Sequence, residues 1–477
     1  MKPLLLFLVS ITVYSFVYSK PVEEYVCQLG FTFEMSQQAG WGQNKPVVIA
    51  IQPLSPADAA GLKVNDIIES INFAPTEGQM VNIIHDWLYN NTDDQIRLTV
   101  SNLKYSNKDL TLFKDCKLAN AINEKDLAYS HAFYSLEDVQ LRNFTCPFKT
   151  NVNSEVNLMK YKTFTFPMID ENHKDLENII NEEIKSFLEK IGLTYVTESA
   201  DLIVHTYYSY NKNLNYEGNV NADKFPTACR YNVHSSTIET LPIYYHPLIN
   251  QRQAQYFLNF GIRLIDRRRS ANNNLFVVWE CEANEMLSGD YRLEAYSKFH
   301  IPLMLMQYPY IKTREAAHFS YKKIKYNYTG LNYNIDNLKE IVDIDRFSPA
   351  YQASIRPGDE VERICGIKLE GDSKEASNAY KQFIYKTMPL RDSKTTYTDA
   401  SGFTKCMFWD KFQYVQVAEA FKNPEYKTMY AYLFYFEPYI NLSGTNILFF
   451  EIKRGKDKFS VKVTPTVRVE QVFENYK

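Results

Sequence analysis

The stretch Gln28-Leu29-Gly30-Phe31 decides the fold of the N-terminal part of the chain. A glycine placed just before a strand can leave consecutive backbone N–H groups exposed, and such groups bind anions. The residues that follow, Phe31 to Met35, read as a strand, and a second apolar run covers residues 47–51. We therefore expect a strand whose first residues form an anion-binding loop.

A short helix is predicted after the second apolar run. Ser55 can cap its start, Pro56 suits its first turn, and Gly61 can adopt the positive φ that ends it. A strand at residues 70–72, a longer helix from about Gly78 to Tyr89 and a closing hairpin complete this part of the chain.

The order of these elements in residues 25–115 resembles a PDZ domain, with Leu29-Gly30-Phe31 at the family's carboxylate-binding loop. The resemblance implies that protein or peptide C-termini are the partners, since an extended peptide can add to an open strand edge. The residues that it implies for peptide binding are Leu29, Gly30, Phe31, Thr32, Met80, Ile84 and Trp87. The alternative is a vestigial groove in a domain that only packs against the rest of the chain.

The longer helix divides its apolar side chains between two sides. We place Met80, Ile84 and Trp87 toward the groove, and Ile83 and Leu88 toward the core. Met80 offers soft apolar contact and no strong hydrogen bond, which predicts a ligand that ends in an apolar residue with another apolar residue two positions before it. A shift of the register by one residue would put Gln79 there and weaken this preference.

The pattern recurs near the C-terminus. Ser348-Pro349-Ala350 matches Ser55-Pro56-Ala57, and the match continues without gaps. This repeat predicts a second PDZ-like domain at residues 322–467. We align Gly330-Leu331-Asn332-Tyr333 with Gln28-Leu29-Gly30-Phe31, which makes Leu331, Asn332 and Tyr333 the peptide-binding candidates. In this alignment Asn332 replaces the loop glycine, so the loop conformation becomes harder to adopt.

The second copy carries an aromatic-rich insertion at about residues 388–443, between a helix near Glu375 to Lys386 and a closing hairpin at 446–465. A structureless loop of this length is uncommon in a compact domain. We expect an additional sub-structure that either covers the groove or docks on the middle of the chain.

A polar connector is expected at residues 116–155, followed by a middle domain at 156–310. The apolar stripe of a helix at 171–191 predicts a helix lying on a sheet. The order of strands and helices in this middle domain resembles an uncharacterised bacterial domain that is common in cell-envelope lipoproteins. The resemblance implies a location in the cell envelope and gives no activity. The predicted fold class is α+β: two PDZ-like, partly open β-barrels flank a central domain of sheet and helices.

Residues 1–19 have the features of a secretory signal peptide: Lys2, an apolar core from Leu4 to Val17, and small residues at Val17 and Ser19 for cleavage. We expect an exported, periplasmic or extracellular protein with no integral membrane segment after signal removal. An uncleaved anchor is the alternative. The formal net charge of −3 gives no sign of nucleic-acid binding.

Seven cysteines are spread along the chain without a CxxC pair, which argues against zinc and thioredoxin-type sites. Cys27 and Cys116 flank the first PDZ-like unit, so export permits a disulfide between them. The alternative is that most of the cysteines are buried thiols.

Motifs of catalysis are missing from the sequence. There is no HExxH, no GxSxG, no aspartic-protease triplet and no phosphate-binding glycine loop. We therefore predict no metal, no cofactor and no catalytic residue, and interpret the chain as a non-enzymatic binding or scaffold protein of the cell envelope. The alternative is a peptidase, or a peptidase accessory factor, with an unrecognised active site.

Overall fold

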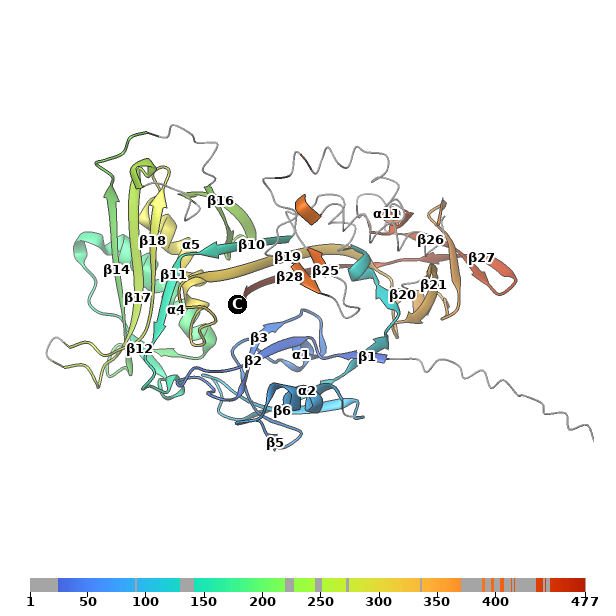
Figure 1. Cartoon of the computed structure of the whole chain (residues 1–477), viewed down its shortest axis with the longest axis horizontal. Coiled ribbons are helices and arrows are strands. Elements are labelled where there is room, and N and C mark those ends of the chain that lie inside the picture. Colours follow the sequence, from blue (N-terminus) through green and yellow to red (C-terminus); the bar gives the residue numbers. More distant parts are fainter. Residues whose placement is uncertain are drawn as a thin grey trace, which may run out of the picture.

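The computed structural model describes residues 25–90, 92–128, 141–218, 227–244, 251–271, 274–334, 337–369, 388–390, 396–398, 404–406, 413, 416, 435–440, 442 and 447–476. Three units follow one another: an N-terminal unit (25–113), a middle domain (148–310) and a C-terminal unit (329–463). In Figure 1 the blue N-terminal unit lies below long strands that run from the green and yellow middle domain to the orange and red C-terminal unit.

The N-terminal unit is an open antiparallel sheet with two helices, as the sequence predicts. Ser55 caps α1 by accepting a hydrogen bond from the N–H of Asp58, and Gly61 ends that helix at φ +79°. The strand order is β2-β3-β4-β6-β7, with β5 beside β4. The elements are β2 (Phe31–Met35), β3 (Pro46–Ile51), α1 (Pro56–Ala60), β4 (Ile67–Ile71), β5 (Ala74–Pro75), α2 (Val81–Tyr89), β6 (Gln95–Ser101) and β7 (Lys108–Phe113).

The C-terminal unit repeats this arrangement. Ser348 caps its first helix by accepting from the N–H of Tyr351, and Ser354 takes the positive φ that Gly61 has in the first copy. The strand order is β27-β26-β22-β21-β20-β9, with β23 beside β22. Its own elements are β20 (Leu331–Asn334), β21 (Asn337–Ile344), α6 (Pro349–Gln352), β22 (Glu360–Ile364), β23 (Ile367–Lys368), β26 (Leu448–Arg454) and β27 (Asp457–Val463).

Strand β9 (Ala121–Asn123) has no counterpart in the first copy. Each of the other strands of the C-terminal sheet matches one strand of the N-terminal sheet in order, from β27 with β7 to β20 with β2. Beyond β20 the C-terminal sheet continues with β9, which comes from the connector after the N-terminal unit. Among the described residues, the N-terminal sheet stops at β2.

The middle domain is an eight-stranded sheet covered by two helices. Helix α4 (Lys174–Ile191) buries Leu176, Ile180, Ile184 and Leu188, so the predicted stripe is its core side. The strand order is β13-β12-β14-β17-β18-β16-β15, with β11 paired to β18. The other elements are β11 (Phe148–Val152), β12 (Thr163–Thr165), β13 (Thr194–Tyr195), β14 (Leu202–Lys212), β15 (Thr227–Asn232), β16 (Thr237–Tyr244), β17 (Tyr256–Asp266), β18 (Val277–Leu287) and α5 (Leu293–Leu305), with single 3-10 turns at Leu158–Lys160, Glu171–His173 and Gln251–Gln253.

The stretch between the first two units is more structured than a polar connector. Its strands β8 (Asp115–Leu118), β9 and β10 (Leu141–Cys146) each pair with a different part of the molecule, and β11 already belongs to the middle sheet. The middle domain therefore starts before residue 156. Strand β10 lies beside β19 (Ala317–Tyr328), which pairs with β28 (Thr466–Tyr476) in a sheet that spans from the middle domain to the C-terminal unit.

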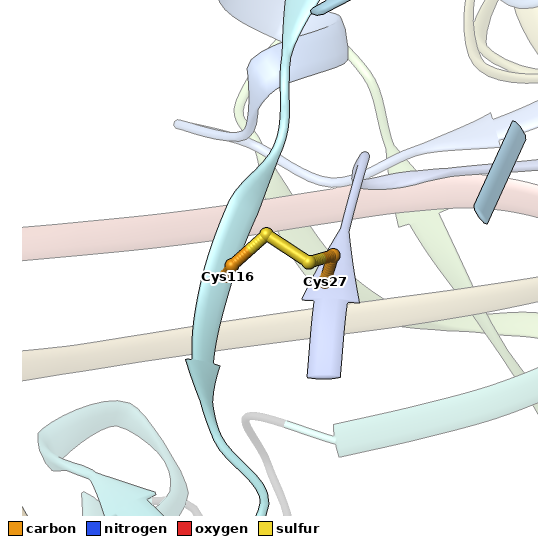
Figure 2. The surroundings of a disulfide bond; sticks show 2 residues. All are labelled: Cys27 and Cys116. Carbon is orange, nitrogen blue, oxygen red and sulfur yellow. A yellow bond between two sulfur atoms is a disulfide. The ribbon is translucent and has the colours of Figure 1, made fainter. Parts of the chain in front are cut away.

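Strand β1 (Tyr25–Gln28) pairs with β8, and the register sets Cys27 opposite Cys116. The two cysteines form a disulfide with a Cα–Cα distance of 3.9 Å (Figure 2). The pairing that the sequence left open is thus present. Of the remaining cysteines whose side chains are described, Cys146 and Cys281 are buried.

The N-terminal unit is packed tightly on the middle domain. Trp41, Val47 and Ile67 join the hydrophobic core of that domain. The side-chain amide of Gln38 adds two hydrogen bonds, donating to the carbonyl of Pro309 at 2.7 Å and accepting from the N–H of Ile311 at 3.0 Å. The unit is therefore held in a fixed position relative to the rest of the chain.

Several predicted features fall on residues that the structure leaves undescribed: the signal peptide at 1–19, the helix near 375–386 and most of the insertion at 388–443. The described pieces of the insertion are the turn Met388–Leu390, the hairpin β24 (Thr396–Thr398) and β25 (Thr404–Cys406), and α11 (Glu437–Ile440). Phe436 and Tyr439 lie in the core of the C-terminal unit. In the described part of the chain, no helix is long and apolar enough to cross a membrane.

Candidate peptide-binding sites

The loop before β2 is fixed in place by the start of α1. The carbonyl of Leu29 accepts the N–H of Ala57 at 2.9 Å, and the carbonyl of Gly30 accepts the hydroxyl of Ser55 at 3.2 Å. Gly30 has φ +76°, and a Cβ there would lie 2.0 Å from Cβ of Ser55. Only glycine fits this position, because both the backbone conformation and the close approach exclude a side chain.

Strand β2 offers an open edge next to this loop. It pairs with β3 on one side, with Phe31 opposite Ile51. Its other side has no paired strand among the residues described, and Thr32 is exposed. An edge strand carries unpaired backbone groups that can accept an additional strand.

Helix α2 turns a different side toward β2 than the sequence suggested. The ring of His85 lies 5.2 Å from that of Phe33 on β2, whereas Ile84 is fully buried in the core. Met80 precedes the helix as its N-cap and is 73% exposed. The placement of Ile84 toward the groove was therefore wrong. The nine-residue helix has apolar residues on more than one side, so the sequence alone does not show which side is buried. In the structure Ile84 and Leu88 are the buried residues.

The C-terminal unit has an equivalent loop two residues before the position expected from the sequence. The carbonyl of Thr329 accepts the N–H of Ala350 at 2.8 Å, as Leu29 does from Ala57. Gly330 has φ +86°, and a Cβ there would lie 2.2 Å from Cβ of Ser348. Gly330 is thus the counterpart of Gly30. The alignment that put Asn332 in place of the loop glycine was wrong, because Asn332 lies inside β20 and corresponds to Thr32.

Strand β9 occupies the edge of β20 that corresponds to the open edge of β2. The pairing is antiparallel, with Asn123 opposite Asn332, Ile122 opposite Tyr333 and Ala121 opposite Asn334. The connector segment thus runs toward the Gly330 loop and adds one strand to the sheet. The candidates Leu331, Asn332 and Tyr333 lie at this contact, and all three are buried.

Glu124, the residue after β9, places its carboxylate in the Gly330 loop. Its oxygens accept the N–H of Thr329 at 2.9 and 3.0 Å, of Gly330 at 3.2 Å and of Leu331 at 3.2 Å. The hydroxyls of Thr329 and Tyr439 also donate to it. Every one of these partners is a donor, so the loop is built to receive a carboxylate.

The chain turns away directly after this residue. The side-chain oxygen of Asn123 accepts the N–H of Asp126 at 3.0 Å and so caps a helical turn at residues 124–128. Leu127 and Ala128 then bury themselves in the core of the C-terminal unit. This turn lets an internal segment present a carboxylate where a chain terminus would otherwise be needed.

Electrostatics at Glu124 reflect two opposing effects. Complete burial raises the pKa of this carboxyl group to about 7, while the surrounding hydroxyl and N–H donors act to lower it. Burial has the larger effect of the two, because a carboxylate that loses its contact with bulk water is costly to charge.

A cavity of about 130 Å³ lies between the two loops. Gln28, Gly30 and Ser55 line it from the N-terminal unit, and Glu124 and Leu331 from the other side. Lys117 and Asp345 form an ion pair of 3.4 Å at its wall. The two loops therefore face a common polar space.

A second cluster of charged groups lies inside the middle domain. Arg230 and Glu285 form an ion pair of 2.7 Å with both side chains about 2% exposed. His300 accepts a hydrogen bond from Arg230 at 2.7 Å, and burial and this cation hold its pKa well below the ordinary value. The two terminal nitrogens of Arg230 are paired with Glu285 and His300 inside the core, as burying a charge requires, while its Nε has no hydrogen-bond partner. In the ranges that the structure describes, no group of His, Cys, Asp or Glu has a geometry that could hold a metal ion.

Comparison with known proteins agrees with this geometry. A PDZ domain model matches residues 47–102, and a model of a domain of unknown function matches residues 148–310. The crystal structure of a PDZ domain protein from Parabacteroides distasonis is 45% identical, covers 95% of this chain and 100% of that one, and superposes with a TM-score of 0.73. This chain belongs to the PDZ domain proteins. The family model marks only the N-terminal PDZ domain, and the C-terminal unit is related to it by the structural repeat.

Other solved structures resemble this PDZ protein over short stretches. The HtrA3 PDZ domain bound to a phage-derived ligand is 15% identical and covers 20% of this chain and 90% of that one, with a TM-score of 0.18. The photosystem II D1 C-terminal processing protease is 16% identical and covers 36% of this chain and 38% of that one, with a TM-score of 0.17. No curated protein matches the chain.

In this PDZ protein some of the predicted site residues lie together at the Gly30 loop, and others lie apart from it. Leu29, Gly30, Phe31 and Thr32 form the loop and the first residues of β2, while Trp87 is partly buried against the core. Their roles in binding stay predictions. Sequence reasoning missed Glu124 in the connector. The signal was weak, namely two apolar residues, Ala121 and Ile122, shortly before an acid in an otherwise polar stretch.

Proposed function

We propose that this PDZ protein is an exported, non-enzymatic binding or scaffold protein of the cell envelope. Its N-terminal PDZ domain would bind C-terminal or extended peptides by strand addition to β2. The Gly30 loop would hold the peptide carboxylate, and the residues from Phe31 onward would pair with the peptide backbone.

The observation that carries the proposal is the match between the two loops. Gly30 and Gly330 share a positive φ and the same close approach to a capping serine. In the C-terminal unit, the N–H groups around Gly330 bind a carboxylate, and a strand lies on the adjacent edge. The N-terminal domain has the same loop beside the open edge of β2, so the same contacts are available to a peptide.

The side chains around the groove indicate a modest and partly apolar specificity. Leu29 and Phe31 keep at most 5% of their surface exposed, so the last residue of a ligand would meet a shallow surface. Val81 lies one helical turn before His85 and both are exposed, and the ring of His85 lies 5.2 Å from that of Phe33 on β2. We therefore expect the ligand residue two before the terminus to contact Val81 and Phe33. His85 can add a hydrogen bond, which Met80 could not.

Export of the protein is supported by the signal-like residues 1–19 and by the Cys27–Cys116 disulfide. Disulfides persist mainly in oxidising compartments such as the periplasm and the extracellular space. Mass spectrometry of the mature N-terminus tests this part of the proposal. Cleavage near Ser19 is expected, and an intact Met1 would contradict it.

Binding is tested with the full-length protein and a library of peptides that present free C-termini. We expect binding to require the free carboxylate, so amidated versions of the same peptides should bind at least tenfold more weakly. Binding that survives amidation would contradict the role of the Gly30 loop. A purely enzymatic role has no support of this kind, because the family models that match the chain describe no catalytic domain.

A further inference from the structure

We propose that the C-terminal unit is a second peptide-binding site, which the chain fills with its own segment Ala121–Glu124. The ligand class of this site is an extended peptide that presents a carboxylate to the Gly330 loop, with an apolar residue two positions before it. In the structure Glu124 supplies the carboxylate and Ile122 the apolar residue. This inference concerns a different unit from the N-terminal groove and does not depend on it.

The first support is the direction of the bound segment. Strand β9 runs antiparallel to β20 and reaches the loop with its last residues. A peptide that adds to this edge and places its terminal carboxylate in the loop would have to run in the same direction. The segment thus has the orientation of a ligand, and only the source of the carboxylate differs, because it comes from a side chain.

The second support is the comparison of the two copies inside one chain. The strand orders of the two sheets match from β7 and β27 to β2 and β20. In the described residues, β9 is the strand that the first sheet lacks, and it comes from outside the repeat. Strand β9 therefore lies outside the set of strands that the two copies share.

The third support is the chemistry of the contact. Ala121, Ile122 and Asn123 are only partly buried, while Glu124 is buried among donors. The aromatic rings of Tyr333, Phe436 and Tyr439 meet edge-on beside the loop, with centroids 5.5 Å and 6.4 Å from Tyr333. The carboxylate is therefore the most enclosed part of the segment, as it is for a peptide held by its terminus.

Segment Ala121–Glu124 is part of the same chain as the site it occupies, so it competes strongly with a peptide in solution. A segment tethered close to its site acts at an effective concentration in the millimolar range. A peptide in solution must compete with it, so the wild-type protein should show a much lower apparent affinity than a protein whose segment is removed from the site. We expect a difference of at least tenfold.

The test uses full-length protein and a fluorescein-labelled peptide with the sequence of residues 119–124 and an amidated C-terminus. The opened variant carries Ile122→Ser and Glu124→Ala, which remove the apolar contact and the carboxylate. The matched control is Asp115→Asn, since Asp115 is an exposed acid on the same connector. Fluorescence anisotropy should give at least tenfold tighter binding for the opened variant than for wild type and the control.

Two further binding measurements show whether the peptide binds at the Gly330 loop. A peptide with Gln in place of its Glu should bind the opened variant at least tenfold more weakly, because it lacks the carboxylate. Adding Gly330→Ala to the opened variant should abolish binding, whereas adding Gly30→Ala should leave it intact. The reverse result would place the peptide in the N-terminal domain and overturn the proposal.

Hydrogen exchange of strands β26 and β27 shows whether the C-terminal unit stays folded in the opened variant. If these strands keep their protection in the opened variant and no peptide binds, the site is not a ligand site. If the opened variant loses the protection of β26 and β27, β9 is a permanent part of the unit, which also overturns the proposal.

Discussion

The hydroxyl of Tyr439 donates a hydrogen bond to the carboxylate of Glu124, although the two residues are 315 positions apart in the sequence. Tyr439 belongs to the aromatic insertion and Glu124 to the connector. The insertion therefore helps to hold the internal segment in the Gly330 loop.

The variant Tyr439→Phe should loosen the internal segment without removing an aromatic ring. A hydrogen bond to a charged group contributes about 1.5–3 kcal/mol. We expect the amides of β9 to exchange with solvent about ten- to a hundredfold faster in this variant, as measured by hydrogen exchange and mass spectrometry. Tyr435→Phe, a change of the same kind in the same segment, is the control and should leave the exchange of β9 unchanged.

Short-range rules predicted the local elements well. Ser55 and Gly61 were predicted as the two ends of α1, and Ser348-Pro349-Ala350 as its repeat, because a cap and a helix-ending glycine are signals within a few residues of sequence. The loop of the second copy was misaligned because an apolar residue precedes Gly30 and Thr329 precedes Gly330. The contact of Glu124 with residues 205 positions later leaves no periodic pattern, so packing alone decides it.

The docking of the internal segment should depend on pH. Burial raises the pKa of Glu124 to about 7 from an ordinary value of 4.5, so the docked form binds a proton more tightly than the undocked form. Deprotonation of Glu124 should therefore weaken docking as the pH rises from 4.5 to about 7, and the N–H and hydroxyl donors that bind the carboxylate keep this loss smaller than burial alone would cause. The total change is on the order of 3 kcal/mol, at about 1.4 kcal/mol per pKa unit.

Hydrogen exchange of residues 329–331, corrected for the intrinsic effect of pH, measures this dependence between pH 5 and 8. Glu124→Gln cannot ionise and should show a flat profile. Protection that stays constant or rises with pH in the wild-type protein would be inconsistent with the raised pKa.

Replacement of Gly30 by Ala should weaken peptide binding by the N-terminal domain at least tenfold. The new Cβ would meet Cβ of Ser55 at 2.0 Å, so the loop must move and its N–H groups lose their alignment. Gly78→Ala is the matched control, because Gly78 also has a positive φ but nothing lies within 4 Å of its Cβ position.

Both variants carry the backbone strain of a side chain at positive φ, about 1 kcal/mol. Isothermal titration with a peptide selected from the library separates them: Gly30→Ala should lose at least tenfold in affinity, and Gly78→Ala less than threefold. Equal losses would mean that strain, and not the loop geometry, governs binding.

The contact between the N-terminal domain and the middle domain should be sensitive to Gln38. Gln38→Ala removes two hydrogen bonds, each with a net contribution of about 1 kcal/mol, and leaves the N–H of Ile311 without its partner. We expect the free energy of unfolding to fall by about 2–3 kcal/mol in urea denaturation. Gln37→Ala, at the exposed neighbouring position, should change it by less than 0.5 kcal/mol.

The Cys27–Cys116 disulfide also determines how mechanical load would pass through the molecule. It joins the first described strand to the connector, so the residues between them form a closed covalent loop. Tension applied to the chain before Cys27 would run through the sulfur atoms into β8 and leave the N-terminal domain unloaded. The next element along the line of force is β9. Pulling at the N-terminus would therefore detach Glu124 from its loop while the first domain stays folded.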